Sequence, residues 1–170
     1  MRLILTLFLL APFSSIAIAQ ANPRSIKGFY RNPAEGYAIR IPKSLNATAG
    51  DQAGPERGVS IRLPSGNTIL TIGEPNSADY KTTREGVRAD LEYDRCHPQA
   101  LTITATNIGK LKGSRGRLVC GNHVHIKLLA FRPGGEPIYW LDLITDLEHE
   151  AEDAAILQSI ASSFSVIRWE

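Results

Sequence analysis

Two histidines and an aspartate occupy alternating positions in the most strongly β-patterned part of the chain. His123 and His125 stand two residues apart, and Asp146 follows the next extended segment, Pro137–Thr145. Imidazole nitrogens and carboxylate oxygens are ligands that zinc and copper accept. If the two extended segments pair as a hairpin, these three side chains share one surface and form a candidate metal site.

A hairpin with its tip at Gly134-Gly135 fixes which residues face each other. One face then carries an apolar ladder, which pairs Ala130 with Tyr139, Leu128 with Leu141, and Ile126 with Leu143. The other face pairs Phe131 with Ile138, Leu129 with Trp140, Lys127 with Asp142, His125 with Ile144, and His123 with Asp146. A slip of one residue would expose the entire ladder, so this register is predicted. The alternative to a metal site is that the polar side chains mark the solvated end of a half-covered sheet face.

Two further charged groups have both a functional and a simpler interpretation. The basic side chains of a glycine-rich bend could hold an acidic partner, or the bend could be a solvated turn. These residues are Lys110, Lys112, Arg115 and Arg117. The acidic run Glu148–Asp153 could chelate a cation, but carboxylates also suit the first turn of a helix because they interact favourably with its dipole.

Motifs of nucleophilic, phosphate-binding and metal-dependent enzymes are missing from the sequence. It contains no G-x-S-x-G, no G-x-x-x-x-G-K-[ST], no H-E-x-x-H and no EF-hand loop. We therefore expect a non-enzymatic protein with no catalytic residues and no cofactor.

The first nineteen residues have the pattern of a cleaved signal peptide. Arg2 precedes an apolar run, and Ala17 and Ala19 are the small residues that signal peptidase accepts. The run is shorter than the ~20 residues that span a bilayer, so no stable membrane anchor is expected after cleavage. The sequence predicts a signal peptide over residues 1–19, one domain over residues 20–170, and a periplasmic or secreted location.

The two cysteines, Cys96 and Cys120, are predicted to form one disulfide because exported proteins fold in an oxidising environment. Closing a loop of about 25 residues should stabilise the fold by roughly 3 to 4 kcal/mol. A redox or metal-thiolate pair is the alternative, although the sequence has no C-x-x-C.

Charge is nearly balanced in the mature chain. The precursor has 19 basic and 17 acidic residues, and loss of Arg2 leaves 18 against 17. This balance gives no reason to expect nucleic acid as a partner.

Hydrophobic periodicity predicts several hairpins and two helices. Hairpins are expected around Asn32–Gly36 and Pro64–Asn67, and a polar surface loop is expected over Lys43–Arg57. Thr82 and Glu85 form a capping box that starts the first helix, which ends at Cys96-His97-Pro98. The last helix begins in the acidic run, and its apolar stripe comprises Ile156, Leu157, Ile160, Ala161 and Phe164. This order predicts an α+β fold with a central antiparallel sheet.

Several short segments together resemble the PsbP-like family. They are Gly36–Pro42, a central helix, Ile108-Gly109 entering a hairpin, Ile138–Thr145, and Ile156–Phe164. The family includes photosystem extrinsic proteins and small secreted bacterial domains. The resemblance implies an α/β/α sandwich and a binding or scaffolding role rather than catalysis, and it carries over no functional residue.

The sequence thus favours a small exported binding or accessory domain of the cell envelope, whose partner is an envelope protein or a small ligand. Two alternatives remain open. One is a periplasmic enzyme inhibitor or toxin-neutralising protein, which would share the size, export and disulfide. The other is a metal-binding protein that uses the His123 surface.

Overall fold

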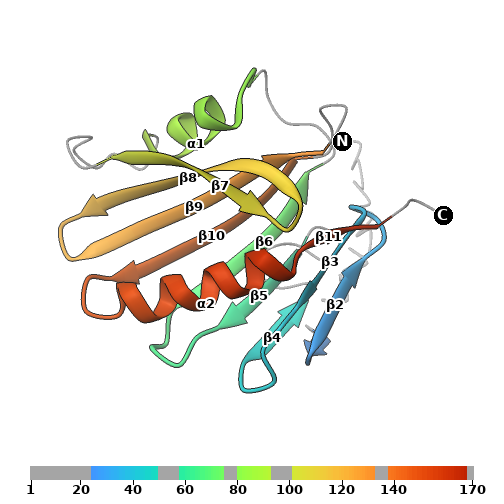
Figure 1. The fold of residues 1–170 in the computed structure, drawn as a ribbon. Coiled ribbons are helices and arrows are strands. Elements are labelled where there is room, and N and C mark those ends of the chain that lie inside the picture. The colour runs from blue at the N-terminus through green and yellow to red at the C-terminus, as the bar shows by residue number, and fades with distance from the viewer. Residues whose placement is uncertain (1–23, 50–57, 75–79, 93–100, 133–137, 168–170) are drawn as a thin grey trace, which may run out of the picture.

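The computed structural model describes residues 24–49, 58–74, 80–92, 101–132 and 138–167. Most of these residues belong to antiparallel sheet (Figure 1). The large sheet contains, in spatial order, β1 (Arg24–Ile26), β4 (Asn46–Ala49), β5 (Gly58–Arg62), β6 (Thr68–Glu74), β10 (Ile138–Asp146), β9 (His123–Phe131), β8 (Leu111–Cys120) and β7 (Thr102–Ile108). The small sheet contains β11 (Ser165–Val166), β3 (Tyr37–Arg40) and β2 (Phe29–Asn32). With the helices α1 (Thr83–Glu92) and α2 (Glu150–Ser163), this confirms the predicted α+β class.

The two helices lie on opposite faces of the large sheet. Side chains alternate between the faces of a strand, and the consecutive residues Leu128 and Leu129 of β9 show the two environments. Leu128 belongs to the main core together with Leu157 and Ile160 of α2. Leu129 packs in a second cluster under α1. Helix α1 contacts β7, β8 and β9, whereas α2 contacts β10, β3 and β7.

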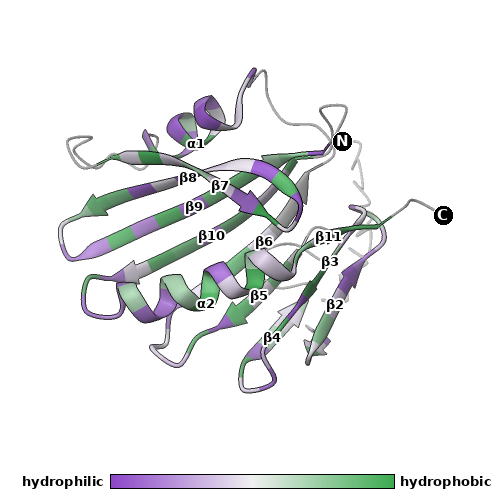
Figure 2. Cartoon of the chain, viewed as in Figure 1, coloured by the Kyte–Doolittle hydropathy of each residue, from purple (hydrophilic) through white to green (hydrophobic). Residues whose placement is uncertain are grey.

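The predicted register of the β9–β10 hairpin is confirmed. Leu128 pairs with Leu141, Lys127 with Asp142, and His123 with Asp146. The apolar ladder is buried in the main core beneath α2, as expected. Figure 2 shows hydrophilic and hydrophobic bands alternating along β8 and β9. The register therefore places the polar face of the hairpin on the side of α1.

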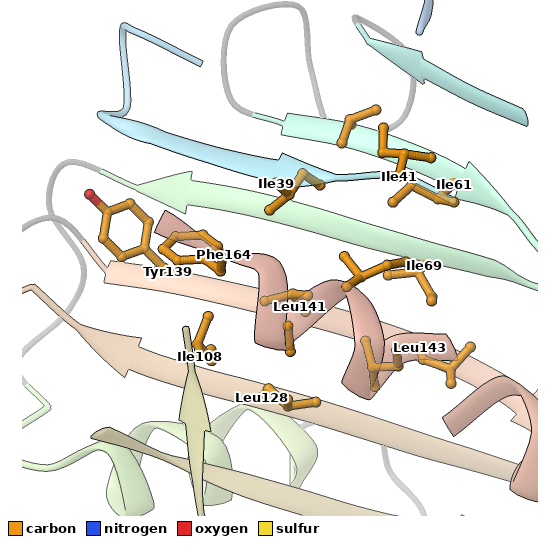
Figure 3. Packing of buried hydrophobic residues seen from close by; sticks show 14 of the residues in the cluster. Ile39, Ile41, Ile61, Ile69, Ile108, Leu128, Tyr139, Leu141, Leu143 and Phe164 are labelled. Atoms are coloured by element: carbon orange, nitrogen blue, oxygen red, sulfur yellow. The ribbon is translucent and has the colours of Figure 1, made fainter. Parts of the chain in front are cut away.

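The small sheet closes over the main core through an aromatic cluster. Tyr37 of β3 stacks on Phe164, with ring centroids 5.3 Å apart, and Tyr139 of β10 lies 4.9 Å from the same Phe164 ring (Figure 3). Burial raises the pKa of Tyr37, whose hydroxyl lies within hydrogen-bonding distance of the Thr71 carbonyl and side-chain oxygens. The first hairpin and the end of α2 thus share one core.

Thr82 caps the start of α1, as predicted, while the Glu85 side chain accepts from the residue before the cap rather than from Thr82 itself. The backbone N–H of Glu85 donates to Thr82 Oγ1 at 3.1 Å, and Glu85 Oε2 accepts from the Lys81 backbone N–H at 3.0 Å. The predicted end of this helix at Cys96-His97-Pro98 lies outside the described residues. No helix among the described residues is long and apolar enough to cross a membrane.

Two sequence-based assignments were wrong. The predicted basic bend is mostly strand β8, and the turn is confined to Gly109 and Lys110. The predicted surface loop over Lys43–Arg57 contains strand β4 at Asn46–Ala49, while residues 50–57 are not described. Both segments lack large apolar residues at alternating positions, so pairing with neighbouring strands, rather than local pattern, determines their structure.

Candidate functional site

His125 lies on the α1 side of the large sheet and is buried, with 9% of its surface exposed. Its Nε2 atom contacts Asp142 Oδ1 on the neighbouring strand β10. The two residues are diagonal neighbours, because the residue directly opposite His125 is Ile144 and the one opposite Asp142 is Lys127. Strand pairing thus brings an imidazole and a carboxylate together away from bulk solvent.

Lys127 connects this pair to helix α1. Its Nζ atom lies 3.0 Å from Asp90 Oδ2 and 3.7 Å from Asp142 Oδ2, and only 7% of its side chain is exposed. The ammonium also lies 3.9 Å from the centroid of the Trp140 ring, a cation–π distance. We call the four residues Asp90, His125, Lys127 and Asp142 the charged cluster.

A glycine beneath α1 makes this arrangement possible. Gly116 of β8 is directly opposite Lys127 in the sheet. A Cβ atom at Gly116 would come within 2.4 Å of side-chain atoms of Val87 and Leu91, so the helix packs against bare backbone. This close approach brings Asp90 within reach of Lys127. Tyr80, which precedes the helix, donates from its hydroxyl to Asp90 Oδ1 at 3.2 Å.

The charges of the cluster depend on one another. Two carboxylates and one ammonium leave a formal charge of −1, which a protonated imidazole would balance. Buried charges are tolerated only when they are paired and hydrogen-bonded, and here Lys127 separates Asp90 from Asp142. The arrangement can fix the positions of Trp140 and Asp142.

Next to the charged cluster, part of the same sheet face is open. Ile144 has 56% of its surface exposed although it belongs to β10, which has strands on both sides. Its direct neighbours are His125 on β9 and Thr68 on β6. Helix α1 covers β7, β8 and β9 instead. We call His123, Ile144, Thr68 and Leu70 the open face.

The structure does not bring together the three residues of the predicted metal site. His123 is exposed at the start of β9, and His125 contacts Asp142. Asp146 Oδ1 instead accepts from the His149 backbone N–H at 2.9 Å and lies 2.8 Å from His149 Nδ1. Within the described ranges, no three or more His, Cys, Asp or Glu side chains are grouped to hold a metal ion. Metal binding here therefore stays a prediction.

Asp146 and His149 shift each other's pKa in opposite directions. The hydrogen bonds from the His149 backbone and side chain lower the pKa of Asp146. The hydrogen bond to Asp146 raises the pKa of His149. The pair lies just before α2, so its carboxylate helps to fix the start of that helix.

Three of the basic and acidic side chains singled out in the sequence, those of Arg117, Glu150 and Asp153, have structural partners. Arg117 donates to both carboxylate oxygens of Glu150, at 2.5 and 2.6 Å, which lowers the pKa of Glu150. Asp153 is fully buried and accepts from Ser65, Asn67 and Thr145 at 2.7 to 2.9 Å. These contacts attach α2 to β8 and to the β5–β6 turn.

Cys120 is half-buried beside the second hydrophobic cluster. Its predicted partner, Cys96, lies outside the described residues. The disulfide therefore stays a prediction.

Sequence reasoning found part of the charged cluster and missed the rest. The Lys127–Asp142 pairing followed from the hairpin register, but the contributions of Asp90 and Tyr80 did not. Asp90 lies between two apolar contacts of α1, Val87 and Leu91, so a polar residue on the buried side of the helix was the only available signal.

Comparison with known proteins identifies the fold. No known protein family matches the sequence, and no curated protein matches it. The solution structure of cyanobacterial PsbP (CyanoP) from Synechocystis superimposes with a TM-score of 0.57 over 92% of this chain and 98% of that chain, at 16% sequence identity. The chain has the PsbP-like fold. A crystal structure from Bacteroides thetaiotaomicron gives a TM-score of 0.49 at 9% identity, over 84% of this chain and 49% of that chain.

The two faces of the large sheet form distinct environments in this chain. One face is filled by α2 and the small sheet, which together cover the main core. The other face carries α1, the charged cluster and the open face. Candidate binding residues are therefore concentrated on the α1 side.

Proposed function

We propose that this protein is an exported, non-enzymatic binding or accessory domain of the cell envelope and that its partner contacts the open face. The observation that carries the proposal is the exposure of Ile144. An isoleucine in a central strand normally faces the core or a covering element, because burying its side chain stabilises the fold by roughly 1.5 to 3 kcal/mol. A partner that covers Ile144 would recover that contribution.

The charged cluster supports a binding role for this face. Lys127 holds the Trp140 ring through a cation–π contact and holds the Asp142 carboxylate through an ion pair. Rigid aromatic and charged groups beside an exposed apolar residue are typical of interface centres, since few conformations are lost on binding. The partner we propose is an envelope protein that presents an apolar side chain to Ile144.

Export is supported by the signal-peptide pattern of residues 1–19. The mature domain would then comprise residues 20–170, with Cys96 and Cys120 joined in a periplasmic or secreted protein. The likeness to CyanoP agrees with an accessory role, which the PsbP-like resemblance implies.

Site-specific photo-crosslinking tests the proposal in living cells. A photoreactive amino acid replaces Ile144 in one variant and Phe29 in a second. Phe29 is the matched control because it is also 56% exposed but belongs to the small sheet. We expect a discrete protein adduct at position 144 and none of that size at position 29.

Substitutions then test whether contact at Ile144 contributes to binding. Ile144→Ser should reduce capture of the crosslinked partner by purified mature protein at least tenfold, whereas Phe29→Ser should leave capture unchanged. Both variants should keep the wild-type far-UV spectrum, because exposed substitutions usually change stability by less than about 0.5 kcal/mol. Equal capture by the two folded variants, or no adduct at position 144, would contradict the proposal.

A further inference from the structure

Strand β7 is the last strand on one side of the large sheet, and none of the described strands pairs with its outer edge. It pairs with β8 through all seven residues, from Thr102 opposite Arg117 to Ile108 opposite Leu111. The continuous register contains no β-bulge. An edge strand presents backbone N–H and C=O groups that can accept another strand.

One hydrogen bond shows which backbone groups of β7 point outward. Arg84 Nη1 of α1 donates to the Ile103 carbonyl at 3.2 Å, so this carbonyl faces away from β8. In an antiparallel pair the backbone groups of alternate residues point to the same side. Ala105 and Asn107 therefore also direct their N–H and C=O groups to the outer edge, and both residues are exposed.

Strand β7 lacks the features that usually protect an edge. Its sequence, Thr-Ile-Thr-Ala-Thr-Asn-Ile, contains no charged residue and no proline. Charged side chains, prolines, bulges and short length are the usual protection. The opposite edge has one such feature, because the described part of β1 carries the charged residue Arg24. Within the ranges that the structure describes, the Arg84 side chain is the group that hydrogen-bonds to the outer edge of β7.

We propose that two copies of this protein pair through β7, in antiparallel orientation about Ala105, and join their large sheets. Ala105 then faces Ala105 of the second copy, and Ile103 faces Asn107 of the second copy. This register uses the outward backbone groups of all three residues. It places two small side chains at the two-fold axis and no like charges opposite each other. Because the contact is isologous, it covers the β7 edge of both copies at once.

The helices leave room for this pairing. Helix α1 packs closely on β8 at Gly116, so the two copies of α1 would be separated by three strand spacings. At ~4.8 Å per spacing this is about 14 Å, more than the 8 to 10 Å between packed helices. The second copy therefore need not displace α1, although the exposed Arg84 side chain has to release the Ile103 carbonyl.

Sedimentation equilibrium of the mature protein over about a hundredfold concentration range tests the pairing. We expect a monomer–dimer equilibrium in the wild type. Ala105→Lys should weaken it at least tenfold, because two ammonium groups would meet at the axis. Arg84→Ala should strengthen it severalfold by freeing the Ile103 carbonyl. Ser25→Lys on the opposite edge strand is the matched control and should have no effect.

Amide hydrogen exchange identifies the edge that is used. The amides of Ile103, Ala105 and Asn107 should become protected as concentration rises in the wild type but not in Ala105→Lys. A monomer at all concentrations for both wild type and Arg84→Ala would overturn the proposal. A dimer that Ala105→Lys leaves intact would overturn it as well.

Discussion

Gly116 lies directly beneath Val87, so that a Cβ atom at position 116 would come within 2.3 Å of Val87 Cγ1. Gly116→Ala should therefore push α1 away from β8 and destabilise the fold by about 1 to 3 kcal/mol, the usual cost of overpacking. Denaturant unfolding measures the change. Lys112→Ala, at an exposed position of the same strand, should change stability by less than about 0.5 kcal/mol. An unchanged midpoint for Gly116→Ala would show that the helix is not held this closely.

The ammonium of Lys127 separates two carboxylates in a poorly solvated site. Lys127→Met keeps most of the side-chain volume but leaves Asp90 and Asp142 without their shared cation, and we expect a loss of roughly 3 kcal/mol. Adding Asp90→Asn removes one of the two charges and should restore part of the loss. Urea unfolding of the single and double variants measures this coupling. Additive effects of the two substitutions would contradict a shared ion pair.

The β9–β10 hairpin shows how much of the fold the sequence could predict. Its register followed from the Gly134-Gly135 tip and the apolar ladder, since a slip of one residue would have exposed Leu128 and Leu141. Strand β8 could not be predicted in full because glycines and basic residues occupy its central positions. From the local sequence, Gly116 is expected in a turn. In the structure, its missing side chain lets α1 pack closely on β8, and this role depends on tertiary packing.

The candidate site was predictable to the extent that it depends on strand pairing. Lys127 opposite Asp142 follows from the register, but the contact of His125 with Asp142 rather than with Asp146 does not. Diagonal contacts depend on side-chain rotamers and on neighbouring partners. Here Asp146 contacts His149, a residue outside the hairpin.

The Asp146–His149 pair predicts a pH window for stability. The pKa of Asp146 is lowered in the folded chain, so its contribution is present above the ordinary value of 3.8 and is lost as pH falls through the folded pKa. The pKa of His149 is raised, so its contribution is present below the ordinary value of 6.5 and is lost as pH rises through the folded pKa. The pair should therefore contribute most between these two ordinary values.

Thermal unfolding across pH tests this window. The difference in melting temperature between wild type and His149→Gln should be largest between pH 3.8 and 6.5 and should shrink on both sides. Asp146→Asn should give the same profile, because either substitution removes the ion pair. A difference that does not change with pH would show that the pair does not titrate with folding.

The predicted disulfide has a direct chemical test. The intact mature protein should gain the mass of two hydrogen atoms on reduction under denaturing conditions, and alkylation before reduction should modify neither Cys96 nor Cys120. Removing the bond with Cys120→Ala should lower stability by roughly 3 kcal/mol in the chain-entropy model. Two alkylated thiols in protein purified from the periplasm would refute the bond.

The small sheet joins the two ends of the described chain. Its order is β11-β3-β2, so Ser165 pairs with Ala38 and Val166 with Tyr37 across more than a hundred residues of sequence. During synthesis the first hairpin cannot pair with its third strand until residues 165–166 have left the ribosome. A nascent chain in that state cannot complete its core early. This delay would suit a polypeptide that crosses a membrane before it folds, which is what the predicted signal peptide over residues 1–19 implies.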